Sequence, residues 1–504
     1  MSDLARVGTP PGRLPVVGHG LRWLQDPLAV LGSLAECGDL ARLQLGPLDL
    51  VVVCSAELTR QVLLDNRTFD REGVLAKRVS QVVGEGGLIT ATRATHRHRR
   101  RLTQPVFHRS RLPGYARTMT AQASVTTAGW RDGQTFDVMT EMLGMTTAVA
   151  VETLFSGSAD DAIQRQAKAD FGTIMEGAYR RILLPPLLFR VPRPRKRRFD
   201  KAMVRLQRTV DASVADTRAS GARRPDLLSA LVASSEADDG LTEHEALRGL
   251  TDREVAILAM EFLGAGAETT ASVLAWSLHL LGGHPTVSAR LWEEVDTVLN
   301  GASAELKHLP QLVMTTRVVM EAMRLYPPGW TLLRGVTRQV TLGGHVLPAG
   351  TAIACSPYVL HRRGDVFDAP DRFDPERWNP EVCEQPDRHA FIPFGDGARK
   401  CIGEEFGLTE AVLALATIVD RWQLEPVPGA EVRAATVLAH ASVRPYEAVT
   451  GGEPVRLCTA VGCSATPGTA AWALLRPLWH PRAGHRTAGP QCPHHVGHGL
   501  SRVR

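Results

Sequence analysis

One long segment, residues 251–281, constrains the fold more than any other feature of this sequence. Thr251 and Glu254 have the spacing of a capping box, which marks the start of a helix. Gly282-Gly283 and Pro285 supply the stop signals. A helix of about 30 residues is ~45 Å long. The segment therefore predicts a helix that crosses an entire domain.

The remaining patterns are mostly helical, with two short β-hairpin signals. A second helix is expected over about 307–326, ending before Pro327-Pro328. Residues 42–54 show apolar or alternating runs about a Gly-Pro turn, and residues 337–355 repeat the pattern about Gly343-Gly344. These signals predict a mainly α fold with small β-sheets.

Composition and charge place the chain among ordinary globular proteins. Of its 504 residues, 44% are hydrophobic and 22% are charged, which argues against disorder. The net charge of +5, from 58 basic and 53 acidic residues, does not indicate nucleic acid as the main partner. The longest apolar runs are far shorter than the ~20 residues of a membrane span. The first residues lack a signal-peptide core, and the eight cysteines are scattered. We therefore expect a cytoplasmic protein with reduced thiols and no membrane span.

The segment 391–403, FIPFGDGARKCIG, carries the most chemical information. Its glycines allow a sharp turn and a close backbone approach to a flat ligand. A helical pattern begins just after Cys401, and a helix N-terminus favours a thiolate over a thiol. Arg399 adds a positive charge that can meet a carboxylate. The alternative, that Cys401 is a buried and inert small hydrophobe, does not account for these neighbours.

The spacing Phe394-x-x-Gly397-x-Arg399-x-Cys401-x-Gly403 resembles the haem-binding signature of the cytochrome P450 family. Further motifs follow in the family's order. The resemblance implies the cytochrome P450 fold, a single large helical domain enclosing haem b, over residues 10–455. Cys401 would be the axial ligand of the haem iron, and the other four signature residues would contact the cofactor.

The long helix carries a second motif, Ala265-Gly266-Ala267-Glu268-Thr269-Thr270. Mid-helix glycines such as Gly266 cost up to about 1 kcal/mol relative to alanine, so they suggest a need for space. The segment resembles the family's oxygen-activation motif. The resemblance makes Thr269 the oxygen-stabilising hydroxyl and Glu268 part of the proton relay, at a position where the family more often has aspartate.

A third motif, Glu321-x-x-Arg324, is weak evidence alone, since such pairs are usually surface ion pairs. Followed by Leu-Tyr-Pro-Pro, it resembles the family's helix-end motif. Residues 373–378 then resemble the segment whose arginine, here Arg377, completes a buried Glu-Arg-Arg network. These three residues would have a structural role, holding the cysteine loop in place.

The basic stretch at 95–108 has two interpretations. Most of its charges fit a solvated helix face, but His96 and Arg100 lie four residues apart, where the family binds haem propionates. Arg334 similarly resembles the propionate-binding arginine after the Tyr-Pro-Pro turn. The remaining arginines, Arg97, Arg99 and Arg101, could present a basic patch to an acidic electron donor.

The family resemblance implies a haem-thiolate monooxygenase that uses dioxygen and receives electrons indirectly from NAD(P)H. The sequence carries no dinucleotide-binding motif, flavin domain or iron–sulfur cysteine cluster of its own. A separate ferredoxin and ferredoxin reductase are therefore the expected partners of a monomeric enzyme. Two alternatives remain open, a haem-thiolate peroxygenase or isomerase and a non-catalytic haem protein that binds a ligand.

The substrate pocket is expected, by family position, from the segments 71–90, 171–190 and 258–270 and from the loop after the second helix. Its named residues are Ala265, Gly266, Trp330, Leu332 and Leu333. These segments are mostly apolar, so an apolar substrate is expected. The opening segment and the loop at Trp330 look most like bacterial sesquiterpene oxidases of the pentalenene oxygenase type, which implies terpenoid oxidation in secondary metabolism, including antibiotic biosynthesis.

Three segments stand outside this assignment. Residues 1–9 are expected to be an N-terminal extension. Residues 456–504 lack acidic residues and accumulate Arg, His, Pro, Gly and Cys, which favours a disordered tail, since no spacing matches a zinc site. The basic cluster at 193–198 is expected to be a solvated loop between helices.

Overall fold

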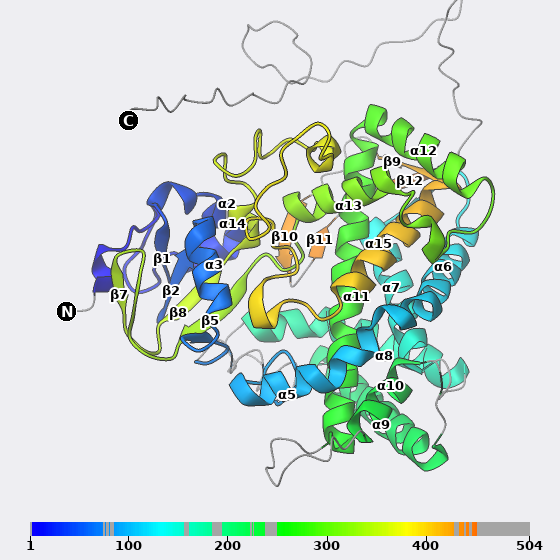
Figure 1. Cartoon of the computed structure of the whole chain (residues 1–504), viewed down its shortest axis with the longest axis horizontal. Helices are drawn as coiled ribbons and strands as arrows, with labels where there is room; N and C mark the ends of the chain where they lie inside the picture. Colours follow the sequence, from blue (N-terminus) through cyan, green and yellow to red (C-terminus); the bar gives the residue numbers. More distant parts are fainter. Residues whose placement is uncertain are drawn as a thin grey trace, which may run out of the picture.

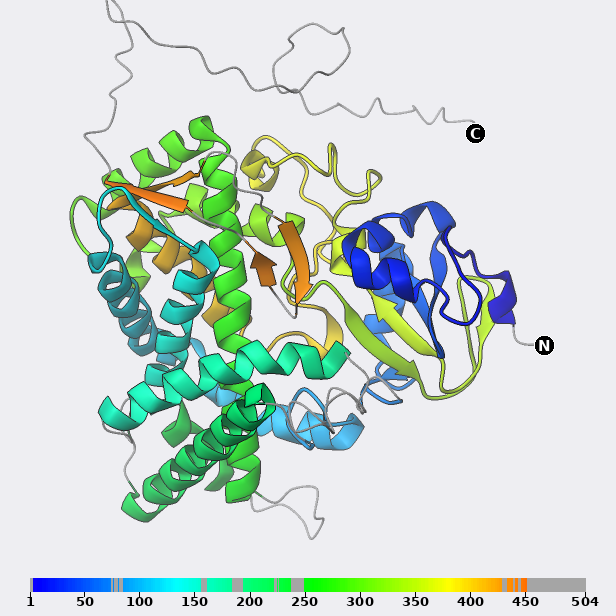
Figure 2. The same ribbon diagram turned by 180° about the vertical axis from the view of Figure 1, so that it is seen from behind.

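The computed structural model describes residues 3–450 except for 74–75, 77–79, 81–84, 156–160, 184–193, 222–223, 225, 237–248, 428–432, 438–439 and 443–445. In Figures 1 and 2 a strand-rich region, drawn in blue and yellow-green, lies beside a larger helical region. The expected mainly α fold with small β-sheets is confirmed. The expected tail at 456–504 lies outside the described residues.

The helical region is built around α11 (Asp252–Gly282), which runs through its whole height in Figure 1. The predicted capping box is present, because the Thr251 hydroxyl accepts from the Glu254 N–H and the Glu254 carboxylate accepts from the Thr251 N–H. The helix ends at the predicted glycine pair. It packs most extensively against α7 (Val138–Phe155). The Thr146 hydroxyl of α7 donates to the Ala267 carbonyl of α11 at 2.7 Å.

The other helices pack around this axis and bury the apolar clusters of the core. They are α5 (Arg93–Thr103), α6 (Leu112–Ala128), α8 (Asp161–Leu183), α9 (Pro194–Ser220), α10 (Leu227–Glu236), α12 (Pro285–Leu299), α13 (Val313–Leu325) and α15 (Glu404–Val419). Shorter helices lie in the strand-rich region or at its border: α1 (Gly20–Gln25), α2 (Pro27–Gly32), α3 (Ala56–Leu64) and α14 (Pro357–Leu360).

The main sheet has the strand order β1-β2-β8-β5-β3. Its strands are β1 (Leu40–Leu45), β2 (Leu48–Val53), β8 (Ala352–Cys355), β5 (Leu332–Val336) and β3 (Phe69–Asp70). Only β2 and β8 pair in parallel. Short strands form the remaining sheets: β6 (Val340–Leu342) with β7 (His345–Leu347), β10 (Arg433–Val437) with β11 (His440–Ser442), and β12 (Tyr446–Thr450) between β4 (Gln134–Phe136) and β9 (Trp422–Pro426).

Both predicted hairpins are confirmed, as β1–β2 and as β6–β7. Gly46, Gly343 and Gly344 adopt positive φ in their turns, which explains why glycines mark them. The prediction for 307–326 is wrong at its start, because α13 begins only at Val313. Pro310 interrupts the expected helix, and residues 306–308 form a separate 3-10 turn.

The prediction for the basic cluster at 193–198 is also wrong within the described residues. Arg195 to Arg198 lie in the first turns of α9 rather than in a loop, and Lys196 pairs with Asp200 one turn later at 2.6 Å. Two helices, α7 and α11, have the length and hydropathy of a membrane span. Most of each one is buried within the protein, as is usual for core helices.

Candidate active site

A single cavity of about 330 Å³ brings the sequence motifs together. Its walls come from α11, α15, β5, the segment around Cys401 and the segment around Leu88. Most of the lining is apolar, and several basic residues of the wall lie close enough together to lower one another's pKa. Such a cavity suits an apolar ligand together with an anionic group.

The segment before Cys401 turns sharply because two of its glycines adopt backbone conformations that other residues avoid. Gly395 and Gly397 have φ of 72° and 68°, and a Cβ at Gly397 would overlap the Leu63 carbonyl. The Cys401 N–H donates to the Phe394 carbonyl at 2.8 Å, which closes the loop. Phe394, Cys401 and Gly403 all line the cavity, so residues of the signature form part of one wall.

Cys401 differs from its expected chemistry in one respect. The Cys401 side chain is exposed to the cavity, yet desolvation by the surrounding protein raises the pKa of the thiol above its ordinary value, and the Glu404 carboxylate adds to the rise. The Gly403 N–H lowers the pKa, as does the nearby Arg100 guanidinium, but these effects are smaller than burial. The helix N-terminus thus acts in the expected direction without deciding the protonation state. A metal cation at the sulfur is what would secure the thiolate.

Four predicted cofactor-binding residues all line the cavity: His96, Arg100, Arg334 and Arg399. Burial lowers the pKa of His96 to about 3, and the neighbouring guanidinium groups lower it further, so its imidazole is neutral. Burial also lowers the pKa of Arg100 and of Arg334.

Arg71 joins this group, and no motif marked it in the sequence. Burial, together with Arg334 and Arg399, lowers its pKa to about 9. Its guanidinium donates to the Ile89 carbonyl at 2.5 Å.

The positive charge of this wall is only partly compensated. Arg399 binds the buried Asp70 carboxylate and donates to the Ala91 carbonyl at 2.8 Å, yet its Nη1 has no partner in the described part of the protein. Arg100 and Arg334 donate to the backbone carbonyls of Lys400 and Leu333. Buried guanidinium groups without carboxylates require an anionic ligand. The carboxylates of a haem fit this requirement.

Across the cavity, α11 presents Ala265, Gly266 and Thr269. The Thr269 hydroxyl donates to the Ala265 carbonyl at 2.7 Å. A Cβ at Gly266 would meet nothing within 4 Å, so this glycine leaves open space beside the helix. Glu268 is buried, and it is not among the described residues that line the cavity.

The remaining predicted pocket residues separate by strand alternation. Leu332 and Arg334 in β5 face the cavity, whereas Leu333 points to the other side of the sheet and packs in the cluster that contains Trp330. Trp330 contacts Trp23 with a ring separation of 5.9 Å. Of the expected pocket segments, residues 74–75, 77–79, 81–84 and 184–190 lie outside the described residues.

Two buried glutamates also line the cavity, Glu261 on α11 and Glu410 on α15. No sequence motif assigned a role to either one. Burial raises the pKa of Glu261 to about 7, although the amides of Leu88 and Ile89 oppose this rise. Burial raises the pKa of Glu410 to about 8, against a smaller opposing effect from the Thr270 hydroxyl. Both residues sit in apolar helical stretches, where a sequence alone does not reveal which side faces a cavity.

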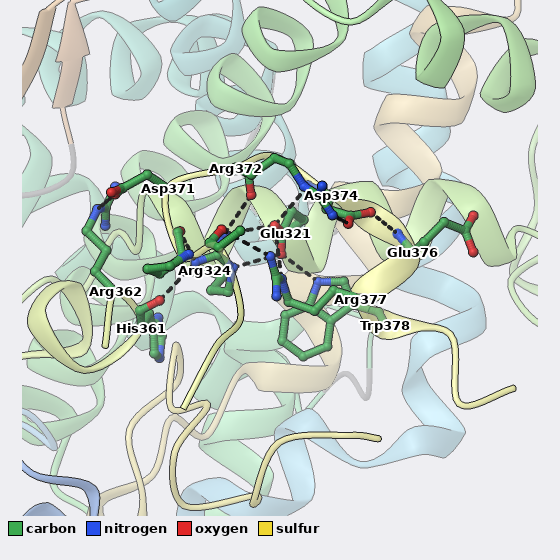
Figure 3. A network of polar contacts seen from close by, with 12 residues as sticks. Glu321, Arg324, His361, Arg362, Asp371, Arg372, Asp374, Glu376, Arg377 and Trp378 are labelled. Atoms are coloured by element: carbon green, nitrogen blue, oxygen red, sulfur yellow. Dashed lines mark hydrogen bonds and ion pairs between the residues drawn. The ribbon is translucent and has the colours of Figure 1, made fainter. Parts of the chain in front are cut away.

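Figure 3 shows the predicted network of Glu321, Arg324 and Arg377. None of the three is among the described residues that line the cavity. Arg324 binds both carboxylate oxygens of Glu321, at 2.9 and 2.8 Å. Arg377 approaches Glu321 at 3.5 Å, and Trp378 donates to it at 3.0 Å. Arg324 also donates to three backbone carbonyls of the segment 361–372. The network therefore ties α13 to the chain that leads to the cysteine loop.

The exposed basic patch is smaller than expected. Arg97 and Arg101 are exposed on α5, but Arg99 is buried and pairs with Glu254 of α11 at 2.9 Å. Arg99 therefore belongs to the interior rather than to a docking surface.

A helical fold with a cysteine facing a cation-lined apolar cavity defines the haem-thiolate class of oxidoreductases. Comparison with known proteins agrees with this class. The family described as Cytochrome P450 matches residues 8–446. The crystal structure of the cytochrome P450DA heme domain shares the fold, with a TM-score of 0.76 and 23% identity over 88% of this chain and 97% of that one.

Curated relatives are closer in sequence. Pentalenene oxygenase of Streptomyces avermitilis is 40% identical over 84% of this chain and 93% of its own. Cyclooctatin synthase and cyclooctat-9-en-7-ol 5-monooxygenase, both of Streptomyces melanosporofaciens, are also 40% identical, over 89% and 84% of this chain and 94% and 90% of theirs. The chain belongs to the cytochrome P450 family. It is a haem-dependent monooxygenase that takes electrons from NAD(P)H through redox partners.

Proposed function

We propose that this cytochrome P450 inserts one atom of dioxygen into an apolar terpenoid of secondary metabolism. The observation that carries the proposal is the cavity, whose lining is mostly apolar and includes Ala265, Gly266 and Leu332. An apolar wall orients a hydrocarbon by shape and by burial rather than by charge. Relatives at 40% identity, among them the one named pentalenene oxygenase, support a terpenoid.

Haem, when bound, supplies oxygen activation, and a thiolate axial ligand favours cleavage of the O–O bond. We assign Cys401 as that ligand. His96, Arg100, Arg334 and Arg399 bind the propionates, and Arg71 joins them from its place in the same wall. These charge-assisted hydrogen bonds orient the cofactor and neutralise buried charge on both partners.

Thr269 and Glu268 handle protons in this assignment. The Thr269 hydroxyl lies on the cavity wall with its proton directed to the Ala265 carbonyl, so its oxygen remains free to accept a hydrogen bond. Glu268 is buried one residue away and exchanges protons with the Thr269 side of the helix. The lining around them excludes bulk water, which limits wasteful protonation.

The proposed partners are a ferredoxin and a ferredoxin reductase, acting on a monomeric cytoplasmic enzyme. The exposed Arg97 and Arg101 of α5 offer positive charge to an acidic ferredoxin. The structural unit that carries this function is residues 10–455, with 1–9 as an N-terminal extension.

The first test is spectroscopic. The reduced, carbon-monoxide-bound protein should show a strongly red-shifted Soret band, and titration with pentalenene should convert the oxidised haem from low to high spin. Turnover should then require NAD(P)H, a ferredoxin and its reductase. Turnover with peroxide alone would instead support a peroxygenase, and binding without any oxygenated product would support a non-catalytic haem protein.

The largest single loss is expected for Cys401→Ser. A serine hydroxyl is a poor thiolate substitute, so the red-shifted band and turnover should both disappear. The reduced carbon-monoxide spectrum and product analysis check this. A variant that keeps both properties would refute the assignment of Cys401.

Thr269→Ala tests proton handling separately from haem binding. The variant should keep the wild-type carbon-monoxide band but yield less product per NAD(P)H, with the difference recovered as peroxide or water. Coupling efficiency measured beside oxygen uptake checks this. Fully coupled turnover would remove Thr269 from the proton relay.

A further inference from the structure

Glu261 stands out among the buried acids because it holds main chain rather than a basic side chain at the cavity wall. Only 3% of its surface is exposed, and its carboxylate accepts hydrogen bonds from the N–H of Leu88 at 2.5 Å and of Ile89 at 3.3 Å. Leu88 and Ile89 themselves line the cavity. A residue of the central helix therefore fixes a wall contributed by a loop.

The same loop is also held by Arg71. Its half-buried guanidinium donates to the Ile89 carbonyl at 2.5 Å, so one peptide segment contacts both this cation and the buried Glu261 carboxyl group. Two residues further on, Arg399 donates to the Ala91 carbonyl. The backbone of this wall thus depends on polar contacts rather than on regular secondary structure, and each of these contacts is sheltered from water.

Gly87 shows how closely the loop approaches the carboxylate. A Cβ at this position would overlap the Glu261 carboxyl group, whose three atoms are its nearest contacts. Gly87 does not have a positive φ, so the absence of a side chain is required by Glu261 and not by the backbone conformation.

We propose that Glu261 is a positioning residue that fixes the Leu88–Ile89 wall against α11, and that this wall determines how tightly bulky apolar ligands bind. The inference rests on the proposed haem site at Cys401, because the ligand must lie between that site and the wall. Removing the carboxylate leaves two buried N–H groups without an acceptor and releases the wall. A bulky ligand must then order the loop as it binds, which costs affinity.

The test compares two iron-binding probes that do not depend on the natural substrate, clotrimazole and imidazole. Imidazole is too small to need the wall, whereas the bulky aromatic groups of clotrimazole fill the cavity. In Glu261→Ala, the dissociation constant of clotrimazole should rise about tenfold, which corresponds to about 1.4 kcal/mol. That of imidazole should stay within about twofold, a difference well below that effect. Glu261→Gln, which keeps a carbonyl acceptor, should recover part of the affinity.

Gly87→Ala supplies an independent variant. It should weaken clotrimazole about as much as Glu261→Ala does, since it expels the carboxylate from its place. The Glu261→Ala background removes the three atoms that the added methyl would meet most closely. The double variant should therefore bind clotrimazole no more weakly than either single one. Additive losses would overturn the proposal.

Glu254→Gln is the matched control on the same helix. Glu254 lies two turns before Glu261 and binds Arg99, but it is not among the described residues that line the cavity. Glutamine preserves its capping role, so clotrimazole affinity should be unchanged. An equal loss in this variant, or an unchanged or tighter clotrimazole constant in Glu261→Ala, would overturn the proposal. A wild-type protein without the red-shifted carbon-monoxide band would instead refute the proposed haem site.

Discussion

Two groups of buried arginines, one in the Glu321 network and one at the cavity, differ sharply in their surroundings. Arg324, in the Glu321 network, is fully buried, and its hydrogen bonds go to a carboxylate and to three carbonyls (Figure 3). At the cavity, Arg399 binds the Asp70 carboxylate. The hydrogen bond described for Arg334 goes to the Leu333 carbonyl instead.

This difference separates a structural group from a ligand-binding one. A buried cation with a complete set of partners stabilises the fold around it. Several like charges gathered without matching carboxylates lower one another's pKa and favour an added anion. A missing partner is insufficient by itself, since the Nδ1 atom of His361 lacks one as well and lies near the Glu321 network. The accumulation of charge at a cavity is what indicates the ligand.

The largest expected effect in this comparison follows from breaking the complete network. Arg324→Leu leaves the Glu321 carboxylate buried, with Arg377 at 3.5 Å as the remaining cation of the described network beside the N–H donors of Trp378 and Asp374. Removing one partner of such a pair typically costs about 3–5 kcal/mol. Denaturant unfolding should show this loss with haem bound and after haem extraction. A stability loss seen only in the haem-bound form would mean that the network serves the cofactor directly.

Arg334→Leu should show the opposite pattern. Losing one charge-assisted bond to a propionate should speed haem transfer to apomyoglobin about tenfold, since such a bond contributes about 1.5–3 kcal/mol. The haem-extracted protein should lose no stability, because burial of this uncompensated cation is itself unfavourable. Arg317→Leu is the control, as Arg317 pairs with Glu376 away from the cavity and should leave haem transfer unchanged. Equal effects of the two variants on haem transfer would remove Arg334 from the cofactor site.

The sequence predicted the parts of this site that depend on neighbours along the chain. The Cys401 loop owes its shape to glycines within three residues of one another, and the α11 capping box needs only Thr251 and Glu254. For the same reason the turn glycines located both hairpins. Local patterns of this kind are written directly into the residue order.

The residues whose roles the sequence did not assign depend on tertiary packing. Arg71 and Glu261 lie within the expected pocket segments 71–90 and 258–270, but no local motif indicates that they meet the same peptide from positions 190 residues apart in the chain. Arg99 resembles its exposed neighbours in the sequence, but in the structure it is buried and forms an ion pair with Glu254 of α11. Leu332 and Leu333 are neighbours in β5, so their side chains point to opposite faces of the sheet and only Leu332 is among the described residues that line the cavity.

Glu410 provides the smallest and most selective test of how burial without a partner affects a charged group at the cavity. It is a buried acid at the cavity, and its Oε1 has no partner within the described residues. Because its pKa in the folded protein, about 8, exceeds the ordinary value of 4.5, folding retains a proton that the unfolded chain releases. Its favourable contribution is therefore complete below pH 4.5 and is lost as the pH rises towards 8.

Glu410→Gln removes this titration while keeping the shape of the side chain. Between pH 5 and pH 8 the wild-type protein should lose stability relative to the variant, by at most about 1.4 kcal/mol per pH unit. Unfolding free energies measured for both proteins at each pH check this, and their difference cancels the other titrating groups. Parallel profiles would mean that water in the cavity solvates the Glu410 carboxylate and that burial does not raise its pKa.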